Sequence, residues 1–324
     1  MRQIITAALV VTCALIGAGH AQDYPTRPVT MVIPFAAGGP TDVLGRVVAD
    51  RLSQILGQQV VVENVGGAGG MTGAQRVAQA APDGYTIGLG TVGTHAQNQT
   101  LYKRPLYNAA TDFTPVALLA QVPLVLIARK DLPANNLKEF IAYVKANQSK
   151  ISYGSAGAGS ATHLGCVLLN AAMGVDVTHV PYRGTGPAMQ DLAGGRIDYL
   201  CEIITTALPQ IQGGTVKPIA MLSLDRSAVL PNLPTANESG LPNFEAYTWN
   251  AIFLPKGTPA PIVKKLQEAL VQTMKTPAVK ERLEGLGAVV VPEDKSTPEY
   301  LDKFVKSEIE KWAAPIRASG ASVE

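Results

Sequence analysis

Short runs of aliphatic and β-branched residues alternate along this chain with segments of helical periodicity, and glycine-rich turns connect them. The run 29–35 (VTMVIPF) predicts a buried strand that ends in Ala-Ala-Gly-Gly. A helix follows from Thr41, with apolar residues at helical spacing and Gly57 as its C-terminal stop. This alternation is typical of α/β proteins, in which helices cover the faces of a central sheet.

The same order continues to the C-terminus. Asn136 and Glu139 have the spacing of a capping box at the start of one helix, and Pro187 fits the first turn of another. Pro123 predicts a break inside the apolar run 116–129. The other expected strands are 59–64, 85–90, 176–182, 196–203, 217–223 and 288–292; the other expected helices are 72–80, 137–148, 160–173, 184–195, 259–274 and 298–316; and 230–243 is an expected loop.

The N-terminal 21 residues have the pattern of a secretory signal peptide. Arg2 gives a positive start, an apolar run covers 4–17, and Gly19 and Ala21 are the small residues expected before a cleavage site. The apolar run is shorter than the roughly 20 residues that a membrane-spanning helix needs. We therefore predict cleavage after Ala21 and a mature protein in the periplasm, where nucleotide cofactors are scarce.

Charge and composition exclude several classes of protein. The net charge of +2, from 27 Lys and Arg against 25 Asp and Glu, lacks the basic excess that nucleic-acid binding needs. Hydrophobic residues make up 47% of the 324 residues, enough for the cores of two domains. Of three cysteines, Cys13 lies in the signal peptide, and the sequence leaves open whether Cys166 and Cys201 pair or stay separate buried thiols.

Two predicted strands lead into glycine-rich turns that begin helices, at 34–42 and 154–163. Glycine lets the backbone approach a ligand and present N–H groups to it, and a helix start carries roughly half a positive charge. Two such turns facing each other would favour a carboxylate without a buried arginine. The alternative is that both are ordinary tight turns. Asp42 would compete with an anion, so capping the helix or bracing the loop is its expected role.

A dinucleotide-binding motif is present only by spacing. The stretch 88–93 (GLGTVG) lies within a strand pattern, and Pro105 interrupts the helix that should follow it. We therefore predict no nucleotide cofactor.

The histidines do not indicate a metal site, because His95, His163 and His179 lack metal-ligand spacing. His179 lies in an apolar strand and is expected to be a core residue. One enzymatic alternative remains open: an exported hydrolase or transferase that uses Ser155 or Ser160 with His163.

Six blocks of the mature sequence follow one another: RPVTMVIPFAAGGPTDVLGR, VVENVGGAGGMTGAQRVAQAAPDGYT, DFTPVALL, YGSAGAGSATHL, VPYRGTGPAMQDLAGGRID and FLPKGTPAPIVKKL. In content and order they resemble the extracytoplasmic solute receptors of tripartite tricarboxylate transporters, also called the Bug family. The resemblance implies a two-domain periplasmic binding protein with a type II-like Venus flytrap fold and no catalysis. It places domain 1 at 23–122 plus 247–324 and domain 2 at 123–246, with the ligand cleft between them.

The same resemblance implies that backbone N–H groups and ordered water hold a small carboxylate in the cleft. Phe35 is expected either to face an apolar part of the ligand or to be a core aromatic residue. Arg183 is expected either to pair with a second carboxylate or to be a solvated charge at the rim. The site residues carried over are Phe35, Ala36, Ala37, Gly38, Gly39, Thr41, Asp42, Thr91, His95, Asn98, Ser155, Ala156, Gly157, Gly159, Ser160, Thr162, His163, Arg183 and Gly184.

The sequence therefore predicts a monomeric solute-binding protein without cofactor or metal. Its expected partners are the membrane permease of a tripartite tricarboxylate transporter or a sensor kinase. Citrate-like acids, dicarboxylates, amino acids and aromatic acids all stay open as ligands, because backbone donors recognise a carboxylate and not the rest of the molecule.

Overall fold

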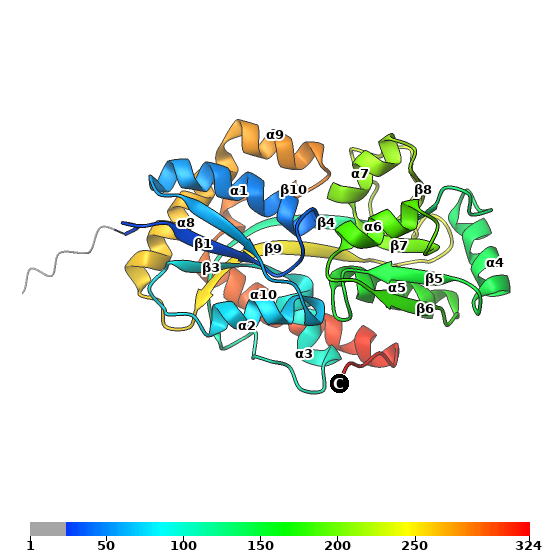
Figure 1. Cartoon of the computed structure of the whole chain (residues 1–324), viewed down its shortest axis with the longest axis horizontal. Coiled ribbons are helices and arrows are strands. Elements are labelled where there is room, and N and C mark those ends of the chain that lie inside the picture. Colours follow the sequence, from blue (N-terminus) through cyan, green and yellow to red (C-terminus); the bar gives the residue numbers. More distant parts are fainter. Residues whose placement is uncertain (1–23) are drawn as a thin grey trace, which may run out of the picture.

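The computed structural model describes residues 24–324 and has two lobes side by side along its long axis (Figure 1). The predicted signal peptide lies outside the described residues. Across those that are described, every helix is too short or too polar to cross a membrane.

One continuous sheet runs through both lobes in the order β2-β1-β3-β9-β4-β7-β5-β6, and β10 and β8 also pair with β4. Parallel pairing of β1 with β2 and β3, and of β5 with β6 and β7, brings the carboxyl ends of these strands toward the middle of the molecule. The strands are β1 (Val29–Ile33), β2 (Val60–Asn64), β3 (Thr86–Thr91), β4 (Phe113–Arg129), β5 (Ser152–Ser155), β6 (Thr178–Pro181), β7 (Tyr199–Ile203), β8 (Val216–Met221), β9 (Tyr247–Pro255) and β10 (Val289–Val290).

Helices cover the sheet in both lobes (Figure 1). In the first lobe Leu44 of α1 and Leu266 of α8 belong to one hydrophobic cluster, whereas Met71 of α2 and Trp312 of α10 belong to a second. In the second lobe α4 to α7 pack against β4, β5, β7 and β8. The helices are α1 (Pro40–Leu56), α2 (Met71–Ala78), α3 (Asn98–Leu101), α4 (Leu137–Asn147), α5 (Ala161–Met173), α6 (Thr185–Ala193), α7 (Ile204–Gln212), α8 (Ala260–Lys275), α9 (Pro277–Gly285) and α10 (Pro298–Ala318).

The two lobes share the long strand β4. Its first part, up to Pro123, pairs with β9, and its second part, from Leu124, pairs with β7 and β8. The predicted break at Pro123 is wrong, since the strand continues through it. Proline has no N–H to give to a ladder, and Pro123 lies where the strand exchanges one set of partners for another.

The two cysteines that the sequence left open are bonded to each other. The Cys166–Cys201 disulfide joins α5 to β7, with 5.4 Å between the Cα atoms. Both residues are fully buried. The bond therefore ties the first half of α5, the helix that follows the second glycine loop, to the middle of β7.

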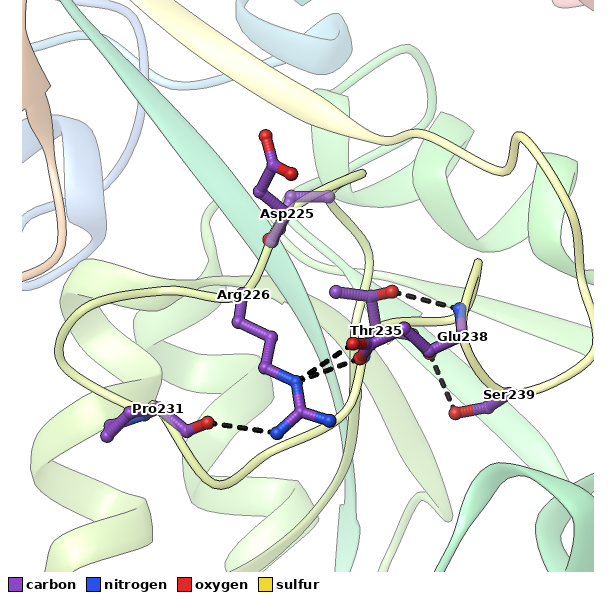
Figure 2. A network of polar contacts seen from close by, with 7 residues as sticks. Asp225, Arg226, Pro231, Thr235, Glu238 and Ser239 are labelled. Carbon is purple, nitrogen blue, oxygen red and sulfur yellow. Dashed lines mark hydrogen bonds and ion pairs between the residues drawn. The ribbon is translucent and has the colours of Figure 1, made fainter.

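The segment between β8 and β9 contains the expected long loop, and side chains hold its shape (Figure 2). Arg226 Nε donates to the two Glu238 carboxylate oxygens at 3.1 and 2.9 Å, and the same guanidinium donates to the Pro231 carbonyl at 3.1 Å. Thr235 and Glu238 form a reciprocal pair, each side chain accepting from the other's backbone N–H. The loop is thus an ordered connection into β9.

Candidate functional site

Four helices begin at one pocket between the lobes. Gly39 precedes α1 in the first lobe, and Ser160, Gly184 and Ile203 precede α5, α6 and α7 in the second. The sequence predicted the glycine turns before α1 and α5 as ligand loops, and the family resemblance added Gly184 before α6; only the start of α7 at Ile203 was missed. The lining residues are Phe35, Gly39, Pro40, Thr41, Thr91, Ala156, Ser160, Ala161, Thr162, Thr185, Ile203 and Thr248.

The lining of this pocket presents backbone groups and neutral side chains to a ligand, because none of the lining side chains is charged. The first N–H groups of a helix have no partner within the helix, and the aligned peptide dipoles make a helix start positive. No side chain caps α1, α6 or α7. The pocket therefore offers uncapped N–H donors from three helices to an anion.

The first glycine loop is braced by Asp42. This buried carboxylate accepts from Gly38 N at 2.9 Å, from Arg46 Nε at 3.0 Å and from Asn64 Nδ2 at 2.9 Å. Burial opposes ionisation of Asp42, but these hydrogen bonds outweigh it and lower its pKa. Asp42 is therefore ionised, and hydrogen bonds within the protein use its carboxylate oxygens, as the bracing role predicts. It does not line the pocket.

The rest of the first loop divides between the pocket and the surface. Phe35, Gly39 and Thr41 line the pocket, whereas Ala37 and Gly38 are exposed. Ala36, between Phe35 and Ala37 in the sequence, is half-buried.

The second glycine loop uses several of its own amides internally. Ser160 caps α5 by accepting from His163 N at 3.2 Å. Three further N–H groups of the loop donate to its side chains: Ala156 to Thr162 Oγ1 at 2.9 Å, Gly157 to Ser155 Oγ at 3.0 Å and Gly159 to His163 Nδ1 at 3.2 Å. Ala156, Ser160 and Thr162 line the pocket, and Ser155, Gly157, Gly159 and His163 shape the loop behind it.

The two lobes touch along glycines. A Cβ on Gly69 would lie 2.2 Å from the Ala158 carbonyl oxygen, and one on Gly93 would lie 2.9 Å from the Gly159 carbonyl oxygen. Both contacts join the first lobe to the second glycine loop, so any larger residue would hold the lobes apart. The contact of Gly93 with the second glycine loop accounts for a glycine at this position.

Hydrogen bonds also cross between the lobes. Ala36 N donates to the Arg183 carbonyl at 3.0 Å, and the Tyr102 hydroxyl donates to the Ala158 carbonyl at 2.9 Å. Arg183 thus contributes its backbone, while its side chain is exposed and does not line the pocket. Gly184, the next residue, is the N-cap of α6.

Two residues carried over from the stretch after β3 lie outside the lining. His95 is buried in an aromatic cluster and stacks on Phe253, with ring centroids 3.8 Å apart; burial lowers its pKa to about 3. Asn98 is fully buried beside Gly159, where a Cβ would lie 2.4 Å from its Oδ1. Thr91 does line the pocket.

The serine and histidine side chains proposed for an enzyme are not paired as expected. His163 Nδ1 accepts from Gly159 N, so its contacts with Ser160 involve the His163 backbone. Ser155 Oγ instead bonds His179 Nε2 at 2.7 Å. Burial lowers the pKa of His163 to about 3 and that of His179 to about 4, so both rings are neutral and structural. His179 is satisfied by its bond to Ser155, but it is half-buried and therefore not the core residue that its strand position predicts.

Glu202 lies directly behind the pocket and was not singled out from the sequence. Its side chain is fully buried, and Oε1 accepts from Thr185 Oγ1 at 3.0 Å and from Thr206 Oγ1 at 2.6 Å. Oε2 has no hydrogen-bond partner among the described residues. Burial raises the pKa of Glu202 to about 7 although both hydroxyls favour the ionised form.

This fold and pocket define a two-lobed solute-binding protein. Among solved structures, the periplasmic binding protein BugD is 45% identical with a TM-score of 0.90, covering 93% of this chain and all of BugD. MatC from Rhodopseudomonas palustris, solved with bound malate, is 42% identical with a TM-score of 0.88 over 90% of this chain and all of MatC. An R. palustris protein solved with adipate is 35% identical with a TM-score of 0.88 over 92% of this chain and 99% of that protein.

Residues 44–321 match the family described as tripartite tricarboxylate transporter family receptor, and this chain belongs to that family. The resemblance that the six sequence blocks carry is therefore confirmed, as is the two-domain α/β binding-protein fold. The chain is a solute-binding receptor and not an enzyme.

Proposed function

We propose that this protein binds a small organic carboxylate between its lobes and delivers it to the membrane permease of a tripartite tricarboxylate transporter. The observation that carries the proposal is the convergence of four helix starts on a pocket whose lining has no charged side chain. Such a pocket attracts an anion by backbone N–H groups and helix dipoles. The malate and the adipate of two similar structures are ligands of this chemical class.

We infer that residues 23–122 plus 247–324 and residues 123–246 are the two domains, and that the ligand favours their closed arrangement. The change of pairing partner after Pro123 in β4, and the return through Tyr247 in β9, support these bounds. A ligand that contacts both lobes has more contacts when they are closed, so it shifts the equilibrium to that state.

The remaining parts of the proposal follow from this role. The predicted signal peptide would deliver the mature protein to the periplasm as a monomer, and the closed form would be the one that a permease distinguishes. A sensor kinase is the second candidate partner.

A calorimetric screen of the purified mature protein tests the binding proposal. The screen covers di- and tricarboxylates, amino acids and aromatic acids, and at least one is expected to bind. Gly39→Val, which places methyl groups beside Thr185 across the pocket, is expected to abolish that binding. The matched control is Gly285→Val, because Gly285 is exposed and a Cβ added there would meet nothing within 4 Å. If no carboxylate binds, or if Gly39→Val binds like the control, the proposal is wrong.

Closure has its own test at Gly93. This residue lies in the helical segment Gly93–Gln97 and is not among the positive-φ glycines, so alanine adds no backbone strain and only brings its Cβ against the Gly159 carbonyl oxygen and the backbone of the second glycine loop. Gly93→Ala is expected to weaken the affinity for the bound carboxylate about tenfold while the unfolding midpoint of the free protein changes little. An unchanged affinity would show that binding does not require this contact between the lobes.

A further inference from the structure

Glu202 controls which way the hydroxyl of Thr185 can point. A threonine hydroxyl has one proton and two lone pairs. The Thr185 proton is directed to Glu202 Oε1 at 3.0 Å, and the Thr206 hydroxyl donates to the same oxygen at 2.6 Å. With its proton committed to the carboxylate, Thr185 presents only lone pairs to the pocket that it lines.

Thr185 also presents a donor on the same side. It is the first residue of α6, and no side chain caps that helix. Its backbone N and its Oγ1 both face the first glycine loop, at 3.9 and 3.7 Å from the Cβ position of Gly39. One residue therefore places an N–H donor and a hydroxyl acceptor next to each other at the wall of the pocket.

We propose that Glu202, acting through Thr185, is a specificity-determining residue that makes the pocket prefer carboxylates with a hydroxyl or ammonium group on the neighbouring carbon. This inference rests on the proposed carboxylate-binding function. The carboxylate binds the backbone N–H, and the donor on the next carbon binds Thr185 Oγ1. A ligand that lacks this donor leaves a buried lone pair unmet, which is unfavourable.

The unpartnered Glu202 Oε2 strengthens the preference. A buried carboxylate with one free oxygen has acceptor capacity that the described residues do not satisfy. Its charge favours the positive end of an O–H or N–H group in the adjoining pocket, and an ammonium group most of all. Glu202 itself acts through Thr185 and is a positioning residue for the ligand.

Matched sets of ligands test this preference by calorimetry at pH 8, where Glu202 is mostly ionised. The sets are succinate, malate and aspartate; glutarate, 2-hydroxyglutarate and glutamate; propionate, lactate and alanine; and phenylacetate, mandelate and phenylglycine. Within whichever set binds, the hydroxy or amino member is expected to bind at least about tenfold more tightly than the unsubstituted acid.

Three variants locate the cause. Thr185→Val removes the hydroxyl at nearly constant shape, and the ratio between substituted and unsubstituted ligands is expected to fall to about one. Thr185→Ser restores a hydroxyl and is expected to restore the ratio. Glu202→Gln can donate from its amide to Thr185 Oγ1, which frees the threonine proton, so the ratio is expected to fall here too.

The outcomes separate this inference from the proposed function. If no carboxylate in the wider screen binds, the proposed function itself fails; if one binds but no hydroxy or amino member of these sets does, only this inference fails. If unsubstituted acids bind as tightly as their hydroxy and amino partners, or if Thr185→Val keeps the wild-type ratio, only this inference fails. Thermal unfolding of each variant shows whether it is folded, and if Thr185→Val does not fold, the ratio in Glu202→Gln decides.

Discussion

Two buried glutamates show how differently one side chain can be used in this molecule. Glu308 of α10, in the first lobe, accepts from the Tyr247 hydroxyl at 2.7 Å and from the indole N–H groups of Trp249 and Trp312 at 3.0 and 3.1 Å. Glu202 of β7, in the second lobe, accepts two hydroxyl hydrogen bonds at Oε1, and Oε2 has no hydrogen-bond partner within residues 24–324. Both are almost inaccessible to solvent.

The difference teaches how to tell a structural buried acid from a functional one. At Glu308 every donor comes from a rigid aromatic side chain, and both carboxylate oxygens are satisfied, so the group fixes α10 against β9. At Glu202 the side-chain donors are rotatable hydroxyls, one carboxylate oxygen is unmet by the residues that the structure describes, and one donor belongs to the pocket lining. A hydrogen-bond network in which every group is satisfied stabilises one arrangement of the side chains. A network with an unsatisfied acceptor favours a ligand that brings a donor into the neighbouring pocket.

The largest expected effect is at Glu308. Glu308→Ala leaves the Tyr247 hydroxyl and both indole N–H groups buried without their acceptor. We expect the free energy of unfolding to fall by about 3–5 kcal/mol, measured by urea denaturation. The control is Glu310→Ala on an exposed turn of the same helix, which should change stability by less than about 0.5 kcal/mol. Equal losses in the two variants would contradict the structural role of Glu308.

The Glu202 region has a covalent support that the Glu308 region lacks. The disulfide of Cys201, the residue before Glu202, closes a loop between positions 35 residues apart. Replacing both cysteines by alanine should lower the free energy of unfolding by about 3–4 kcal/mol, chiefly because the unfolded chain gains freedom. Denaturation of the wild type with and without reductant gives an independent measure. A double variant as stable as the oxidised wild type would show that this bond adds nothing to stability.

The third effect depends on pH and concerns Glu202. Glu202 has an ordinary pKa of 4.5, which burial raises to about 7. Between these values the unfolded chain loses this proton while the folded protein keeps it, so rising pH destabilises the wild type. Glu202→Gln does not titrate there. We therefore expect the stability of Glu202→Gln relative to wild type to rise by about 3 kcal/mol from pH 4.5 to 7 and then level off.

The free energy of unfolding of Glu202→Gln must be compared with that of the wild type at each pH, because other groups also titrate in this range. His95, His163 and His179 have pKa values lowered from 6.5 by burial, so both proteins lose stability as the pH falls below 6.5. That loss is common to both and cancels. A difference that stays flat from pH 4.5 to 7 would mean that Glu202 titrates normally in the folded protein.

Local patterns were enough for most elements and for half of the pocket. Gly57 ends α1 in a left-handed conformation at φ 68°, and Asn136 caps α4 by accepting from Glu139 N, as their positions in the sequence predict. The glycine turns before α1 and α5 were found for the same reason, since conformation and capping are properties of neighbouring residues.

The features that the sequence did not predict depend on contacts between residues far apart in the chain. Strand β9 has no glycine turn at its start and was not predicted, although it pairs with both β3 and β4 in the middle of the sheet. The start of α7 at Ile203 has neither a glycine nor a capping side chain. In the sequence, Glu202 is a single carboxylate near the end of a predicted strand, with no neighbouring pattern that marks it as buried. Its role as a buried acceptor depends on the hydroxyls of Thr185 and Thr206, which only the fold brings to it.

The smallest expected effect concerns a third glutamate network, the exposed one in Figure 2. Arg226 and Glu238 form a two-oxygen contact, but their side chains are 44% and 42% exposed. Water screens such a pair and competes for its donors. We expect Arg226→Ala to lower the free energy of unfolding by less than about 1 kcal/mol, measured alongside Glu308→Ala. A loss as large as that at Glu308 would mean that geometry at the surface, rather than burial of the acceptor, decides what these carboxylates contribute.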